Sequence, residues 1–120
     1  MKIALTSTGN NLDSEVDPRF GRASFIIIVD TETLEFTALD NHENKNAFKG
    51  AGIKAASMIN DNNAEALLTG YCGPNAFSTL DAAGIKVVNG ISGTIKEAIE
   101  KFRQGDFEYA DKENAEANWT

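Results

Sequence analysis

The sequence has a single cysteine, Cys72, so no disulfide can form within the chain and nothing indicates an oxidising compartment. Basic residues are also few. The chain has 11 Lys and Arg against 18 Asp and Glu, a net charge of −7 that argues against nucleic acid or an anionic membrane as partner. No apolar run approaches the roughly 20 residues of a spanning helix, and the chain becomes polar too soon after Met1 for a signal peptide. We therefore expect a cytoplasmic protein.

The remaining composition is that of a globular chain. With 42% hydrophobic residues in 120, there is room for one domain with a substantial core, and we place it at residues 1–105. Residues 106–120 are acidic and have no sustained periodicity, which predicts a flexible C-terminal tail. The less favoured alternative is that Phe107, Tyr109 and Trp119 dock on the domain.

Apolar periodicity predicts five strands and about three helices. The predicted strands are 2–6, 23–29, 34–39, 64–68 and 85–88, and the predicted helices run from 53 to about 62, from about 75 to 83, and from an N-cap at Thr94 through 104. The order is thus three strands, helix, strand, helix, strand, helix: an antiparallel meander followed by β-α-β units, whose parallel crossovers join the last two strands. With the closing helix, this predicts an α/β fold with a mixed five-stranded sheet of ribonuclease H-like connectivity.

The segment from Leu68 to Ala76 contains the most informative turn. A buried strand ends there, two glycines and Pro74 follow, and a helix begins. Cys72 therefore lies at the carboxyl end of a strand and the amino end of a helix, where the helix dipole favours the thiolate, a soft metal ligand. The alternative is a buried free cysteine that acts as a small hydrophobic residue.

The long polar connection 7–22 supplies further candidates. Arg19 and Arg22 flank Phe20 and Gly21, and their guanidinium groups are suited to an anionic cluster or oxyanion. The alternative is that they form salt bridges with Asp17 inside the loop. Under either interpretation, Phe20 is expected to anchor the loop in the core.

Two helix starts are candidate anion sites, since backbone N–H groups there bind anions. Gly50 and Gly52 open one helix, and Gly73 and Asn75 open the next. Because ligands of open sheets collect beyond the carboxyl ends of parallel strands, we expect the loop 7–22, Cys72 and the turn 90–93 to converge. His42, the only histidine, is a candidate metal ligand or simply a solvated side chain.

Five motifs occur together and in order: Asp17–Ala23 (DPRFGRA), Gly50–Ile53 (GAGI), Gly70–Ala76 (GYCGPNA), Ala83–Val87 (AGIKV) and Gly93–Ala98 (GTIKEA). Over roughly residues 1–105 the chain resembles the dinitrogenase iron–molybdenum cofactor biosynthesis family, which includes NifX-type carriers, nitrogenase accessory factors and small stand-alone proteins. The chain lacks the histidine-containing motif associated with the accessory factors. The resemblance implies a ribonuclease H-like fold and a non-enzymatic carrier of an iron–molybdenum or other metal–sulfur cluster or its precursor. It also implies partner proteins that donate and accept the cluster.

Catalytic functions have little support in the sequence. A ribonuclease H-type nuclease needs clustered carboxylates, whereas the acidic residues of the first loop are not on core strands. A Cys72–His42 hydrolase pair has no orienting third residue, and a thiol redox role lacks a second cysteine. The alternative to a cluster carrier is a module that binds a small anion or a protein through the same crevice without metal.

Overall fold

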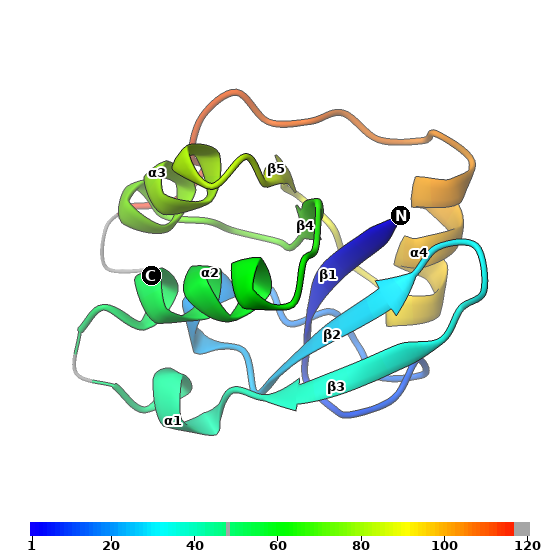
Figure 1. Cartoon of the computed structure of the whole chain (residues 1–120), viewed down its shortest axis with the longest axis horizontal. Helices are drawn as coiled ribbons and strands as arrows, with labels where there is room; N and C mark the ends of the chain where they lie inside the picture. The colour runs from blue at the N-terminus through cyan, green and yellow to red at the C-terminus, as the bar shows by residue number, and fades with distance from the viewer. Residues whose placement is uncertain (48, 117–120) are drawn as a thin grey trace.

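The computed structural model describes residues 1–47 and 49–116. A five-stranded sheet runs through the molecule, with helices on both faces (Figure 1). The elements are, in chain order, β1 (Lys2–Ser7), the 3-10 turn η1 (Phe20–Arg22), β2 (Phe25–Asp30), β3 (Phe36–Asp40), α1 (His42–Lys45), α2 (Ala51–Asp61), β4 (Ala66–Leu68), α3 (Pro74–Ala82), β5 (Lys86–Val88) and α4 (Ile95–Arg103).

The sheet has the strand order β3-β2-β1-β4-β5. β1 is central: it pairs antiparallel with β2 and parallel with β4, while β3 pairs antiparallel with β2 and β5 parallel with β4. This confirms the predicted mixed α/β sheet with its antiparallel meander and parallel crossovers. The helix count differs, because α1 spans only four residues and is too short for helical periodicity to reveal.

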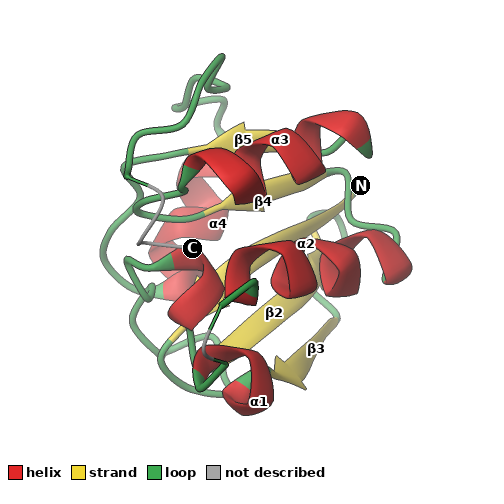
Figure 2. Ribbon diagram, turned by 90° about the vertical axis from the view of Figure 1, so that its left-hand side faces the viewer, coloured by secondary structure: helices red, strands yellow, loops and turns green. Residues whose placement is uncertain are grey.

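Alternation along the buried strands divides the core into two layers. Ile3 and Leu5 of β1 face α4, whereas Ala4 faces the layer that α2 and α3 cover. Figure 2 shows α2 and α3 on one side of the sheet and α4 on the other. β2 and β4 are nearly continuous apolar runs because both of their faces are buried, whereas the edge strand β3 is largely exposed.

The structure also confirms the predicted start of the last helix. The Thr94 side chain accepts a hydrogen bond from the backbone N–H of Glu97, and the Glu97 carboxylate accepts one from the backbone N–H of Thr94. This reciprocal capping box fixes where α4 begins.

The C-terminal segment differs from the predicted tail. Over 106–116 it packs on the rest of the chain: the Phe107 ring stacks on Phe102 with centroids 4.4 Å apart, and Tyr109 meets Phe107 edge-on at 5.0 Å. The Ala110 N–H then donates to the Val87 carbonyl at the edge of β5. Sequence periodicity missed this segment because it is extended and held by isolated contacts. The alternative prediction that Trp119 docks on the domain concerns a residue outside the described ranges.

None of the helices in residues 1–47 and 49–116 has both the length and the apolar character needed to cross a membrane.

Candidate functional site

Three connections meet at the carboxyl ends of β1, β4 and β5. The Tyr71 N–H donates to the Pro18 carbonyl (2.7 Å), and the Phe20 N–H donates to the Tyr71 carbonyl (3.1 Å), which joins the loop after β1 to the loop after β4. The Val16 N–H donates to the Gly93 carbonyl (2.8 Å), which joins the first loop to the turn after β5. The predicted convergence of these three segments is confirmed.

The first loop is fixed by η1. Phe20 is fully buried in the layer beneath α2 and α3, as predicted for an anchor, and Gly21 is buried beside it. The Arg22 guanidinium donates to the backbone carbonyls of Lys45 (3.0 Å) and Ala47, just after the short helix α1. Arg22 therefore has a structural role: it ties the first loop to the segment before α2. The Asp17 carboxylate accepts the backbone N–H of Arg19 (3.1 Å).

The amino ends of α2 and α3 lie at this same end of the sheet. β3 ends at Asp40, which pairs with Phe25, and Phe25 pairs with Ser7 at the end of β1. Both α2 and α3 then run back toward the amino ends of the parallel strands, side by side in Figure 1. Gly50 and Gly73, at the starts of these helices, therefore lie at the same end of the sheet.

The starts of both helices have backbone N–H groups suited to an anion. Among the described residues, neither the N-cap Gly50 nor the N-cap Gly73 is assisted by a side-chain capping hydrogen bond. Gly52 is buried in the first turn of α2, while Asn75 is exposed in the first turn of α3. First-turn N–H groups of a helix carry partial positive charge, and here two such helix ends lie at the same end of the sheet as the first loop, on which Arg19 is exposed.

Cys72 is the centre of the predicted site, but its environment corrects the predicted thiolate. The residue is fully buried among apolar side chains, and its Sγ lies 3.7 Å from the Gly73 carbonyl oxygen. Burial raises the pKa of the Cys72 thiol from 9.0 to about 12, and the negative charge of Glu113 adds to the rise. Three pKa units correspond to about 4 kcal/mol, whereas a helix dipole contributes about 0.3–2 kcal/mol. Desolvation therefore outweighs the dipole, and the thiol is protonated at neutral pH.

This raised pKa predicts an alkaline loss of stability. Below pH 9 the thiol is protonated in both states. Between pH 9 and 12 the unfolded chain releases the proton while the folded chain keeps it, so rising pH favours unfolding. We expect the free energy of unfolding of the wild type to fall relative to that of Cys72→Ala by up to about 1.4 kcal/mol per pH unit. Urea titrations of both proteins from pH 8 to pH 11 measure this, and parallel curves would contradict the assignment.

His42 lies apart from Cys72. Its ring contacts Phe25 edge-on at 5.3 Å, and its Nδ1 lies 2.7 Å from an Asp40 carboxylate oxygen. These partners belong to β2 and β3, and β3 is three strand spacings from β4, roughly 14 Å. In residues 1–47 and 49–116 no group of three or more His, Cys, Asp or Glu side chains is arranged to hold a metal ion. The structure therefore does not bring the two predicted metal ligands together.

Sequence reasoning did not identify Asn114, which contacts the site. Its side-chain Nδ2 donates to the Gly70 carbonyl (2.9 Å), its Oδ1 accepts from the Cys72 N–H (2.8 Å), and its own N–H donates to the Cys72 carbonyl (3.2 Å). An asparagine in an acidic segment without periodicity carries no local signal of such a role.

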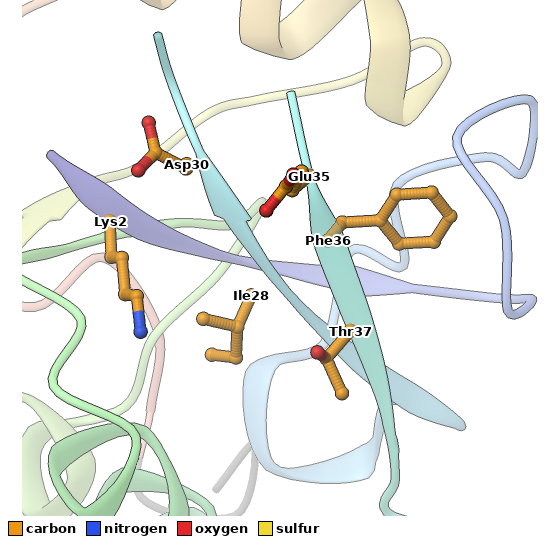
Figure 3. A pocket seen from close by; sticks show the side chains of 6 residues that line it. All are labelled: Lys2, Ile28, Asp30, Glu35, Phe36 and Thr37. Atoms are coloured by element: carbon orange, nitrogen blue, oxygen red, sulfur yellow. The ribbon is translucent and has the colours of Figure 1, made fainter. Parts of the chain in front are cut away.

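A groove of about 240 Å³ lies at the opposite end of the sheet, where the amino end of β1 meets the β2–β3 hairpin. Figure 3 shows Lys2, Ile28 and Thr37 on one side of these strands and Phe36 turned away from them. None of the predicted site residues lines this groove.

Comparison with known proteins gives the chain a family. The family model for the dinitrogenase iron–molybdenum cofactor matches residues 1–105. The uncharacterized protein MJ0580 of Methanocaldococcus jannaschii is 34% identical over 110 residues, 90% of each chain. The apo form of the orange protein from Desulfovibrio gigas superposes with a TM-score of 0.92 at 43% identity, over 95% of this chain and 96% of that one.

The solution structure of the Thermotoga protein TM1290 is also similar, with a TM-score of 0.82 at 36% identity over 96% of this chain and 97% of its own. The match of the family model includes the first loop, the loop after β4 and the turn after β5. The chain belongs to the dinitrogenase iron–molybdenum cofactor family.

Proposed function

We propose that the protein is a non-enzymatic, cytoplasmic carrier of an iron- or molybdenum-containing metal–sulfur cluster or its precursor. It would receive this cargo from one protein of cluster assembly and deliver it to another. The observation that carries the proposal is the pair of helix amino ends beside the Asp17–Ala23 loop, in a chain of the dinitrogenase iron–molybdenum cofactor family.

The chemistry of the crevice favours a cargo held as an intact anion. Clusters built from sulfide and metal ions carry negative charge, which complements two helix amino ends and the positive charge of Arg19, an exposed residue. A set of protein ligands that would build a cluster is not found among the described side chains, and the Cys72 thiol is protonated. Backbone N–H groups near Gly52, Gly73 and Asn75 would thus hold the cargo, and Cys72 would bind metal only after losing its proton.

Anaerobic reconstitution tests this function. The protein is incubated with iron(II), sulfide and molybdate, desalted, and analysed for metal, acid-labile sulfide and sulfide-to-metal absorption bands. We expect uptake by the wild type, and affinity about tenfold lower for Arg19→Gln, because one charge-assisted hydrogen bond contributes roughly 1.5 kcal/mol. Arg103→Gln is the matched control, since Arg103 pairs with Glu100 on α4, on the other face of the sheet. A wild type that takes up neither metal nor sulfide would overturn the proposal.

The second candidate is a module that binds a small anion or a protein segment in the same crevice without metal. The buried, protonated state of Cys72 favours this alternative, because such a thiol contributes no charge to ligand binding. Titration of the metal-free protein with molybdate or phosphate distinguishes the two. Saturable binding that is unchanged in Cys72→Ala, together with no uptake in reconstitution, would select the anion module.

A further inference from the structure

The segment 106–116, which we call the strap, connects the two faces of the molecule at the site. It leaves α4 on one face, crosses the outer edge of β5 through the Ala110–Val87 hydrogen bond, and reaches the loop after β4. In Figure 1 the strap runs across the upper edge of the molecule from α4 toward α3. It is therefore anchored at both ends, by ring stacking on Phe102 and by Asn114.

Asn114 binds the loop in the manner of a neighbouring strand. Its side-chain amide matches the peptide groups of Gly70 and Cys72, donor to acceptor and acceptor to donor, and its backbone N–H supplies a third hydrogen bond. On the other side, the same loop is held by Pro18 and Phe20 through the backbone of Tyr71. Asn114 is thus one of two clamps on this loop, and it is the one that belongs to the strap.

We propose that the strap is a movable cover of the site, and that Asn114 is the positioning residue that holds the loop Gly70–Gly73 in place and controls solvent access to Cys72. Three features support it. Residues 111–114 of the strap are exposed, beyond the Phe107 ring stack it is held by the hydrogen bonds of Ala110 and Asn114, and the Cys72 backbone that Asn114 binds carries a fully buried side chain. Segments with few buried contacts open at low free-energy cost. The role in cargo entry rests on the proposed function, whereas the opening itself does not.

Thiol labelling of the full-length, metal-free protein tests the cover. The reaction of Cys72 with 5,5′-dithiobis(2-nitrobenzoate) at pH 8 is followed in the wild type, in Asn114→Ala and in Ala110→Pro, which removes the N–H that binds the edge of β5. We expect labelling to be at least tenfold faster in both variants than in the wild type. Lys112→Ala, a change of an exposed side chain in the same strap, should label at the wild-type rate.

Urea denaturation gives the free energy of unfolding of every variant, and the labelling rates are compared with it. Equal rates in all four proteins would overturn it. Faster labelling in Asn114→Ala alone would also overturn it, because the loop would then depend on Asn114 without the strap opening as a unit. Labelling rates that rise only in proportion to the loss of global stability would likewise overturn the proposal, because Cys72 would then react through global unfolding.

Reconstitution of the same variants separates this inference from the proposed function. Labelling as expected in proteins that take up no metal would leave the cover in place and remove the carrier function. Metal uptake by the wild type, together with equal labelling rates in all variants, would support the carrier function and remove the cover.

Discussion

Replacing Phe20 with alanine is expected to lower the free energy of unfolding by about 3–5 kcal/mol. The ring is fully buried in the layer between the sheet and helices α2 and α3, so its removal takes apolar contacts away and leaves a cavity. Within η1, Phe20 is the residue whose large side chain lies in the core. Without this anchor, the first loop should also become more mobile. Urea denaturation measures the stability, and hydrogen exchange of the Phe20 and Tyr71 amides reports the loop.

Phe36→Ala is the matched control for this prediction. Phe36 has the same side chain on the edge strand β3 but is 42% exposed, and we expect a loss below about 1 kcal/mol. Phe20→Leu should recover part of the stability, because it restores much of the volume. A loss at Phe20 no greater than that at Phe36 would show that the ring does not anchor the loop.

Gly70→Ala is expected to cost about 2–3 kcal/mol through a clash between backbones. A Cβ at this position would lie 2.8 Å from both the Cα and the carbonyl oxygen of Pro18. That oxygen accepts the Tyr71 N–H, so relief of the clash must lengthen the hydrogen bond that joins the two loops. We therefore expect faster amide exchange at Tyr71 and weaker uptake of cargo in reconstitution.

Gly84→Ala separates this clash from the general cost of losing a glycine. Gly84 has φ +77° and an added Cβ would meet nothing within 4 Å, so only the backbone conformation is penalised, by about 1 kcal/mol. Its position after α3 leaves the contacts of the first loop unchanged, and Tyr71 exchange should stay at the wild-type rate. A Gly70→Ala protein with unaltered Tyr71 exchange would show that the two loops tolerate greater separation.

The sequence was sufficient for the sheet and for the end of the sheet at which the site lies. Continuous apolar runs such as Phe25–Val29 identify buried strands, and chain order then fixes which connections follow the parallel strands. Phe20 was predictable as an anchor because it is the one aromatic residue in a mostly polar loop. These inferences depend on local pattern, which the sequence records directly.

The electrostatics of the site could not be predicted in the same way. The ionisation of Cys72 depends on how deeply the thiol is buried in the apolar layer between the sheet and the helices, and on the nearby charge of Glu113. Arg22 reaches carbonyls more than twenty residues away, and Asn114 binds a loop 42 and 44 residues earlier. Such long-range contacts leave no periodic trace, so neither the structural role of Arg22 nor that of Asn114 was evident from the sequence.

The central place of β1 has a consequence for the order of folding. Its antiparallel partner follows it directly in the chain, whereas its parallel partner does not: the Thr6 and Thr69 hydroxyls, 2.8 Å apart, are separated by 63 residues. Bringing such distant segments together costs roughly 4 kcal/mol of chain entropy before any contact offsets it. We therefore expect the antiparallel β1–β2–β3 unit to form before β4 joins it, with the joining of β4 as the slow step. The site beyond the ends of β1 and β4 would then be completed only after three of the five strands have paired.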